Sequence, residues 1–269
     1  MSDEIYIQRN VNQQQPSESK FPSEQIDLPS EGRIYPNNHV LSSGKVELKY
    51  MTAREEDILT NANNIRRGNA LDKLLESLIV DKNVKIDDLI SSDKSALIVA
   101  CRRLAYGDNY GPFKIKCPKC QEESSHSFDI SKLANVTIPE EHKPRNANNF
   151  RFELPFSKRV VTVKLLTHKD ETDIENELKS LKKINAENLP ELSTRLKYHI
   201  TSVDGNADKG YVRSFVDKEL LSRDSLELRK FLKKINPDIE LKFNFSCNSC
   251  SHEDRLEVPL TAEFFWPST

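Results

Sequence analysis

The feature that most constrains this 269-residue chain is a pair of Cys-x-x-Cys motifs, one in each half of the sequence. Cys117 and Cys120 form the first motif, and Cys247 and Cys250 form the second. Each motif follows an alternating strand pattern (FKIKCPKC and LKFNFSCNSC), which predicts a β-hairpin with the cysteines at its tip. Such a tip supplies two thiolates to a zinc ion, and a closed structural site needs four. The sequence therefore predicts one structural Zn²⁺ site made by all four cysteines.

An internal duplication would explain why the two motifs lie so far apart. Zinc ribbons usually separate their cysteine pairs by about 15 to 20 residues, whereas residues 121–246 intervene here. The segment VELKYMT, ending at Thr52, is similar to VTVKLLT, ending at Thr167, and an acidic residue follows each threonine after three positions, as in a capping box. Helical patterns and a hairpin with Cys-x-x-Cys then follow in the same order. Chance similarity between short segments is the alternative interpretation.

These patterns predict an α+β fold of two related helix-plus-hairpin halves joined by a four-cysteine zinc centre. Residues 1–27 are rich in Gln, Ser, Pro and Glu and are expected to form a flexible arm, either an inert tail or a segment that orders on a partner. The first half spans 28–135, a crossover loop rich in Pro and Asn spans 136–150, and the second half spans 151–269. Apolar spacing predicts helices at 53–63, 69–80, 93–105, 167–183, 189–200, 210–221 and 225–235.

Other roles for the cysteines and histidines fit the sequence less well. A thioredoxin-like redox pair lies at a helix N-terminus, but these motifs lie between strand patterns. His126 and His252 are alternative zinc ligands, yet they follow their motifs at different offsets, which favours histidines in solvated loops. Cys101 lies within an apolar helical stripe and is expected to be a small core residue.

Composition and missing motifs argue against several functions. The net charge of -2 gives no general electrostatic reason for nucleic-acid binding, although a zinc-ribbon nucleic-acid binder remains an alternative. No apolar run approaches the ~20 residues of a membrane span, and the N-terminus lacks a signal pattern, so we expect a protein of a reducing cytoplasm. No phosphate loop, HExxH motif or nucleophile elbow occurs, so no enzymatic activity is expected.

The C-terminal sequence contains Phe264, Phe265 and the only tryptophan, Trp266, in succession. Two interpretations are open: the aromatic tail docks back on the core, or it presents an anchor to a partner, because aromatic residues dominate interface energetics. We expect these three residues to contact a partner protein.

Several segments carry a resemblance to a known family: LPSEGRIYP, VELKYMTAREEDILTN, RRGNALDKLLESLI, AYGDNYGPFKIKCPKC and the terminal PLTAEFFWPS. Together they resemble the T-even-type bacteriophage baseplate hub assembly chaperone family, over essentially everything after Leu28. The resemblance implies a non-enzymatic protein that acts on hub or tape-measure proteins in the cytoplasm of the bacterial host. A permanent structural subunit of the baseplate is the alternative. No catalytic residues of the family are carried over.

Overall fold

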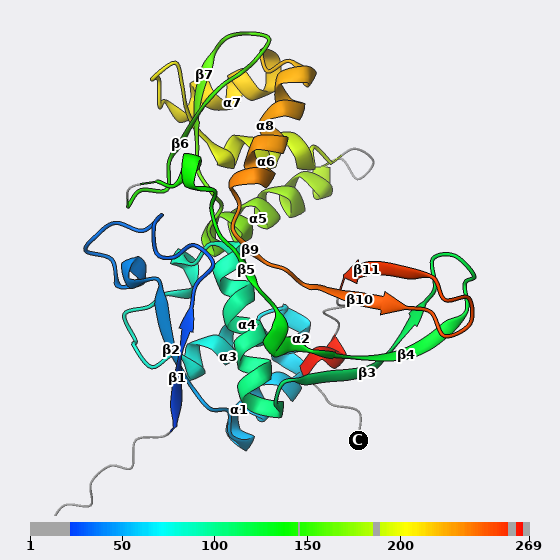
Figure 1. The fold of residues 1–269 in the computed structure, drawn as a ribbon. Coiled ribbons are helices and arrows are strands. Elements are labelled where there is room, and N and C mark those ends of the chain that lie inside the picture. The colour runs from blue at the N-terminus through cyan, green and yellow to red at the C-terminus, as the bar shows by residue number, and fades with distance from the viewer. Residues whose placement is uncertain (1–21, 145, 185–188, 258–261, 266–269) are drawn as a thin grey trace, which may run out of the picture.

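Short antiparallel strand pairs alternate with helices along the chain, which gives a mixed α+β architecture (Figure 1). The computed structural model describes residues 22–144, 146–184, 189–257 and 262–265. These residues contain eight α-helices: α1 (Ala53–Thr60), α2 (Ala62–Arg67), α3 (Ala70–Leu78), α4 (Ser91–Tyr106), α5 (His168–Ile184), α6 (Glu191–His199), α7 (Lys209–Lys218) and α8 (Ser222–Ile235). None of the helices in the described ranges is long and apolar enough to cross a membrane.

The strands form four pairs and one three-stranded sheet within the described residues. The pairs are β1–β2, β3–β4, β5–β9 and β10–β11, and the sheet has the order β6–β7–β8. Their bounds are β1 (Ser23–Asp27), β2 (Lys45–Lys49), β3 (Asn109–Lys116), β4 (Glu123–Asp129), β5 (Asn135–Val136), β6 (Phe150–Glu153), β7 (Val160–Val163), β8 (Ile200–Val203), β9 (Asp238–Ile239), β10 (Lys242–Ser246) and β11 (Glu253–Glu257).

The first part of the chain begins with the β1–β2 pair and a capped helix. Glu55 closes the predicted capping box, since the Thr52 N–H and hydroxyl donate to its carboxylate at 3.0 and 2.5 Å. Lys49 lies 3.2 Å from the same carboxylate. After α3, Ile79 forms an antiparallel bridge with Leu48 of β2. The end of the strand, the start of α1 and the end of α3 are thereby joined.

The second part repeats these contacts with different residues. The Thr167 N–H and hydroxyl each donate to Asp170 at 3.0 Å, and Lys164 lies 2.7 Å from that carboxylate. After α6, Ile200 pairs with Val163 of β7. Both predicted capping boxes are therefore present, and in each a lysine three positions before the threonine lies beside the acidic residue.

A buried aspartate in the first turn of α4, and another in the first turn of α8, each bind the loop between two paired strands. Asp93 of α4 accepts hydrogen bonds from the N–H and hydroxyl of Ser30, at 3.0 and 2.7 Å. Asp224 of α8 accepts from the N–H groups of Phe156 and Ser157, at 2.8 and 3.0 Å. Because the carboxylate satisfies amides that would otherwise be unpaired, each loop is fixed against the helix that follows it.

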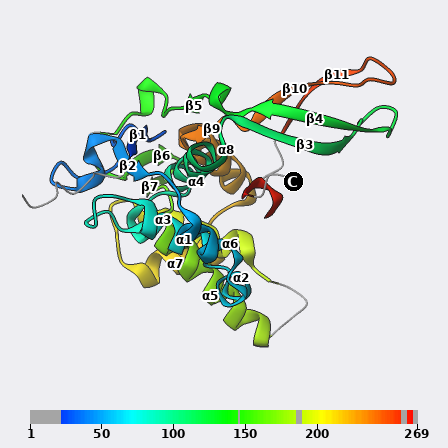
Figure 2. The same cartoon turned by 90° about the horizontal axis from the view of Figure 1, so that it is seen from below.

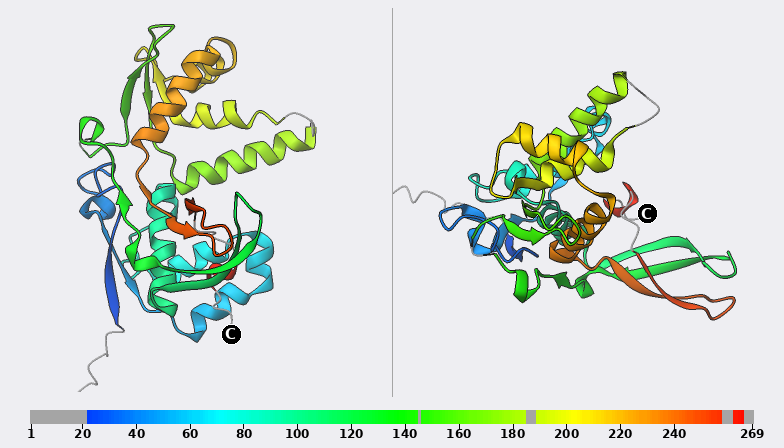
Figure 3. Two further views of the ribbon diagram at one scale, coloured as in Figure 1. Left: turned by 45° about the vertical axis from the view of Figure 1, so that its right-hand side comes forward. Right: turned by 90° about the horizontal axis from the view of Figure 1, so that it is seen from above.

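The second part is stacked on the first, with α5 against the 3₁₀ turn Ile86–Asp88 that precedes α4 (Figures 1 and 3). One continuous core connects both parts, and the β5–β9 pair links them again near the end of α8.

The structure differs from the sequence-based predictions in three places. The flexible arm was predicted to span 1–27, but Ser23–Asp27 form β1, because Ile26 pairs with Val46 and is buried. Residues 1–21 lie outside the described residues. The sequence patterns also did not predict α2, which is a short helix capped by the side chain of Asn61. The segment predicted as a crossover loop contains Val136 of β5 and one 3₁₀ turn, Glu140–His142, before β6.

Candidate metal centre

Two β-hairpins lie side by side and extend from the body of the molecule, as Figures 1 and 2 show. We call them the hairpin arm (residues 109–129 and 242–257). Aromatic rings join the hairpins: Phe113 meets Phe243 edge to face at a centroid distance of 5.6 Å, and His126 lies 4.8 Å from Phe245. The packing of these rings aligns the two hairpins, so that their tips meet at the outer end of the arm.

Each tip has the same backbone geometry. In the first, the Cys117 N–H donates to the Glu122 carbonyl and the Gln121 N–H donates to the Cys117 carbonyl, both at 2.9 Å. The second tip makes the two equivalent bonds around Cys247, at 2.9 and 3.0 Å. Gln121 and Ser251, which follow the second cysteine of each motif, have φ angles of 62° and 52°. This left-handed residue turns the chain so that both sulfurs of a motif face the same point.

The four predicted ligands come together. Cys117 Sγ lies 3.7 Å from Cys250 Sγ, and Cys120 Sγ lies 3.6 Å from Cys247 Sγ. All four sulfurs lie within 4.8 Å of one another. A tetrahedral zinc ion with bonds of ~2.3 Å places neighbouring sulfurs about 3.8 Å apart. The donor set and the observed spacing therefore fit a Zn²⁺ ion bound by four thiolates.

The electrostatics of the cluster favour a cation at its centre. The backbone amides of Cys250 and Ser249 lower the pKa of Cys247 to about 6. The backbone amide of Glu122 acts in the same direction on Cys120, but desolvation and the other three sulfurs raise the pKa of Cys120 to about 12. Four neighbouring thiols cannot all ionise unless a positive charge compensates them, and a zinc ion supplies that charge.

Such an ion would have a structural role. Four thiolates complete a tetrahedral shell and leave no position for water or substrate. The bound metal would hold the two hairpin tips together, and the chain's own residues orient the sulfurs through the backbone bonds of each tip. Cys117 and Cys247 are buried and Cys120 is exposed. The first cysteine of each motif is therefore shielded from solvent, whereas Cys120 lies at the surface of the arm.

The other candidate ligands lie elsewhere or have other contacts. His126 Nε2 lies 2.7 Å from Ser124 Oγ, and His252 is 3.8 Å from Asp254, so neither belongs to the sulfur cluster. Cys101 is buried in α4, where burial raises its pKa to about 12. Its expected role as a core residue agrees with this position.

The aromatic tail is placed differently from the prediction of a partner-binding anchor. Phe264 and Phe265 are only 2% and 4% exposed, and Phe264 meets Tyr110 edge to face at 5.0 Å. They belong to the core of this chain, so in this conformation neither ring is free to bind a partner. This corresponds to the other interpretation of the tail, docking on the core. Trp266 lies outside the described residues.

Arg102 holds the tail in place and was not recognised in the sequence. Its Nε donates to the Phe264 carbonyl at 2.6 Å, and its terminal nitrogens donate to the carbonyls of Gly107 and Asn109 at 3.4 Å. The guanidinium also lies 5.0 Å from the ring centroid of Tyr106. The only sign of this role in the sequence is that an arginine interrupts an apolar helical stripe. The residue that accepts its main hydrogen bond lies 162 positions away, so a local pattern does not reveal the contact.

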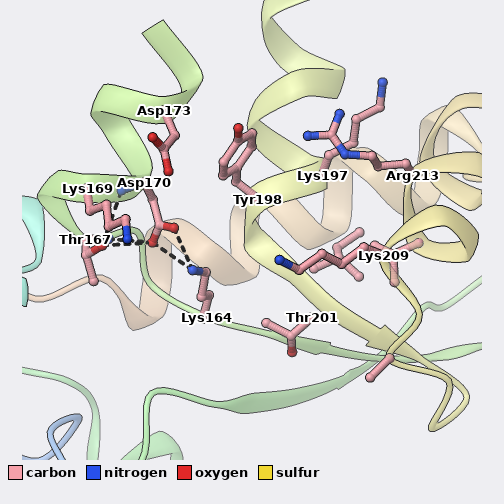
Figure 4. A pocket seen from close by; sticks show the side chains of 13 residues that line it. Lys164, Thr167, Lys169, Asp170, Asp173, Lys197, Tyr198, Thr201, Lys209 and Arg213 are labelled. Atoms are coloured by element: carbon pink, nitrogen blue, oxygen red, sulfur yellow. Dashed lines mark hydrogen bonds and ion pairs between the residues drawn. The ribbon is translucent and has the colours of Figure 1, made fainter. Parts of the chain in front are cut away.

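The second part also contains a polar cavity of about 590 Å³ between α5, α6, α7 and β8 (Figure 4). Lys164 binds Asp170 there, as described above. Arg213 donates to Glu177 at 2.9 and 2.8 Å, and Tyr198 donates to the same carboxylate at 3.1 Å. These bonds join α5 to α6 and α7 and fix part of the cavity wall through ion pairs.

Comparison with known proteins gives one family. A family model described as T4 bacteriophage base plate protein matches residues 27–266, which include both cysteine motifs and nearly all of the described structure. Searches of curated proteins and of solved structures gave no significant match. The match supports the expected relation to a phage baseplate at the level of the family. This chain belongs to the T4 bacteriophage base plate protein family.

Proposed function

We propose that this protein is a non-enzymatic assembly factor for the hub of a phage baseplate, binding hub or tape-measure proteins in the host cytoplasm during assembly. Membership of the base plate family supports the setting. The observation that supports a scaffold role is the sulfur cluster, in which four cysteines lie within 4.8 Å of one another and would fill the coordination sphere of a tetrahedral metal, so that a metal there would have no open position for a substrate. A metal in that environment stabilises a binding scaffold.

We further propose that the scaffold consists of two related halves. The support is a set of contacts that recur at equivalent places: the capping boxes of Glu55 and Asp170, the buried Asp93 and Asp224, and the backbone bonds of the two hairpin tips. The zinc would then join the ends of two small units and supplement the core between them.

Capture of partners tests the assembly role. The full-length chain, carrying an affinity tag, is incubated with separately purified hub and tape-measure proteins of the same phage, with zinc present throughout. The proposal expects retention of at least one of them, and no retention by a Cys247→Ser variant if the hairpin arm forms the contact. No retention of any of these proteins by the wild type would overturn the assembly role.

A permanent structural subunit of the baseplate is the second candidate, and the description of the matching family as a base plate protein favours it. The two functions differ in the fate of the protein. Quantitative mass spectrometry of purified virions separates them, because an assembly factor is lost from the mature particle whereas a subunit is present in a fixed ratio to hub proteins.

Deletion of residues 266–269 tests the remaining part of the aromatic prediction. Phe264 and Phe265 stay in the chain in this variant, so the packed core is preserved. Weaker retention of a hub protein would support Trp266 as a partner contact, and unchanged retention would remove it from the mechanism.

A further inference from the structure

The contact between the two parts of the chain is made at the start of α4. The His168 N–H donates to the Leu89 carbonyl at 2.7 Å, and the Ser91 N–H donates to the Leu166 carbonyl at 3.4 Å. Between them, Ile90 forms an antiparallel bridge with Thr167. The second part covers this surface so well that Ile90 is 1% exposed.

The second part presents an equivalent surface at the start of α8. Leu221 precedes α8 as Ile90 precedes α4, with φ and ψ of -63° and 143° against -68° and 156°. Within the described residues, however, no bridge pairs Leu221 as Thr167 pairs Ile90, and Leu221 is 52% exposed. Phe156, which is held beside it by Asp224, is also 52% exposed. We call Phe156 and residues 220–222 the α8 end.

The complementary surface is also uncovered. The residues of the first part that correspond to Leu166–His168 are Met51, Thr52 and Ala53, at the start of α1. Thr52 and Ala53 are exposed, and the preceding Tyr50 is an exposed large hydrophobic residue. We call residues 50–53 the α1 end. Figure 1 places the start of α8 and the β6–β7 loop at the top of the molecule and α1 at the bottom, so the two ends face in opposite directions.

The backbone groups at these ends match those used inside the chain. In the contact between the two parts of one chain, the carbonyls of Leu89 and Leu166 accept hydrogen bonds. The N–H groups of Ser91 and His168 donate them. Their counterparts are the carbonyls of Leu220 and Met51 and the N–H groups of Ser222 and Ala53. No hydrogen bond within the described residues uses any of these four groups, and the first N–H of a helix has no partner inside the helix.

We propose that the α8 end of one chain binds the α1 end of a second copy, repeating between chains the contact that joins the two parts within a chain. The inference rests on the proposed relation of the halves and not on any hub partner. The Met51 carbonyl would accept from the Ser222 N–H of the next chain, and the Leu220 carbonyl would accept from the Ala53 N–H. The apolar side chains of Leu221 and Phe156 would be covered by the α1 end. Because the two surfaces differ, association is head to tail.

The contact between chains is weaker than the one within the chain. The internal contact is flanked by a polar cluster in which His168 Nε2 lies 3.1 Å from Asp72 and Lys94 Nζ lies 3.0 Å from His168 Nδ1. The counterpart of His168 is Ala53 and the counterpart of Lys94 is Ser225, so the cluster is missing between chains. Association is therefore expected to depend on protein concentration.

Analytical ultracentrifugation of the zinc-loaded chain over a concentration series tests the proposal. The wild type is expected to form dimers and larger species, and Leu221→Asp is expected to remain monomeric. Leu226→Asp is the matched control, since Leu226 is a comparably exposed leucine within α8 and outside the α8 end, and it should associate like the wild type. Zinc content and far-UV circular dichroism equal to the wild type show that each variant is folded.

Mixing two variants tests the head-to-tail geometry. Tyr50→Glu damages only the α1 end and Leu221→Asp only the α8 end, so each should be monomeric alone. Their mixture should form a one-to-one pair through the two intact ends and nothing larger. A monomeric wild type, association of Leu221→Asp like the wild type, or two monomeric variants that do not pair would each overturn the proposal. A monomeric wild type that still retains hub proteins would refute this inference and leave the assembly role standing.

Discussion

Cys117 Sγ lies 3.7 Å from Cys250 Sγ, although 133 positions of sequence separate the two residues. The first belongs to the hairpin that follows α4 and the second to the hairpin that follows α8. A metal bound by both would close a loop that contains the entire second set of helices. The site therefore constrains the relative position of the two hairpins, which aromatic packing also aligns.

Cys247→Ser is expected to remove the metal. Three thiolates are left, and structural zinc sites contribute on the order of 10 kcal/mol to folding in zinc-finger peptides. Because the body has its own core, we expect the loss to appear in the hairpin arm. Zinc content by mass spectrometry should fall from one ion per chain to nearly none, and amide exchange of residues 109–129 and 242–257 should accelerate. Cys101→Ala should retain its zinc. Two zinc ions per wild-type chain, or none, would contradict the shared site.

Asp224→Asn is expected to lower the free energy of unfolding by about 2 kcal/mol. The carboxylate accepts from the N–H groups of Phe156 and Ser157, and its pKa is lowered because these bonds outweigh desolvation. An asparagine side chain keeps one acceptor and turns a donor towards the other N–H. Urea unfolding measures the change. Asp217→Asn is the control, because the carboxylate of Asp217 is exposed and a surface ion pair such as the one it makes with Lys197 contributes about 1 kcal/mol or less. Equal effects of the two substitutions would refute the role of Asp224.

Glu55→Gln is expected to make the protein less stable at neutral pH and less sensitive to acid. Desolvation alone would raise the pKa of Glu55, but hydrogen bonds from Thr52 and Ser77 lower it to about 2. The folded pKa lies below the unfolded value of about 4.3, so this stabilisation is present above that pH and is lost as pH falls towards 2. Its size is about 3 kcal/mol.

Urea unfolding of Glu55→Gln and the wild type between neutral pH and about pH 2 measures this difference. Asp57→Asn, an exposed acidic residue on the same helix, should follow the wild-type curve. Parallel curves for Glu55→Gln and the wild type would show that the carboxylate does not contribute in this way.

Arg102→Met is expected to release the turn that contains Phe264. Hydrogen bonds from a charged donor contribute roughly 1.5 to 3 kcal/mol, and the bond from Arg102 Nε to the Phe264 carbonyl is buried. Hydrogen exchange should therefore become faster around residues 262–265, with increased binding of a hydrophobic dye. Arg103→Met provides the comparison, since Arg103 pairs with Glu24 near the surface. Unchanged exchange in Arg102→Met would mean that aromatic packing alone holds the tail.

The sequence predicted those parts of the molecule that depend on neighbouring residues. The capping boxes at Thr52 and Thr167 and the bonds of the hairpin tips join residues three to five positions apart, so their patterns are visible in a short segment. The helices from α3 to α8 follow the predicted stretches closely for the same reason. The four cysteines could be grouped because only a set of four completes a zinc site.

Tertiary structure alone decided the remaining features, because their partners are distant in sequence. Ile26 lies in a strand only through its pairing with Val46, and the buried Phe264 meets Arg102, which is 162 positions away in the sequence. Ile90 and Leu221 precede α4 and α8 in similar local conformations, yet Ile90 is buried and Leu221 is exposed. This difference depends on contacts with residues that are distant in the sequence. Local sequence determined the shape of each unit, and stacking of one unit on the other decided which surface was covered, since burial depends on what lies opposite.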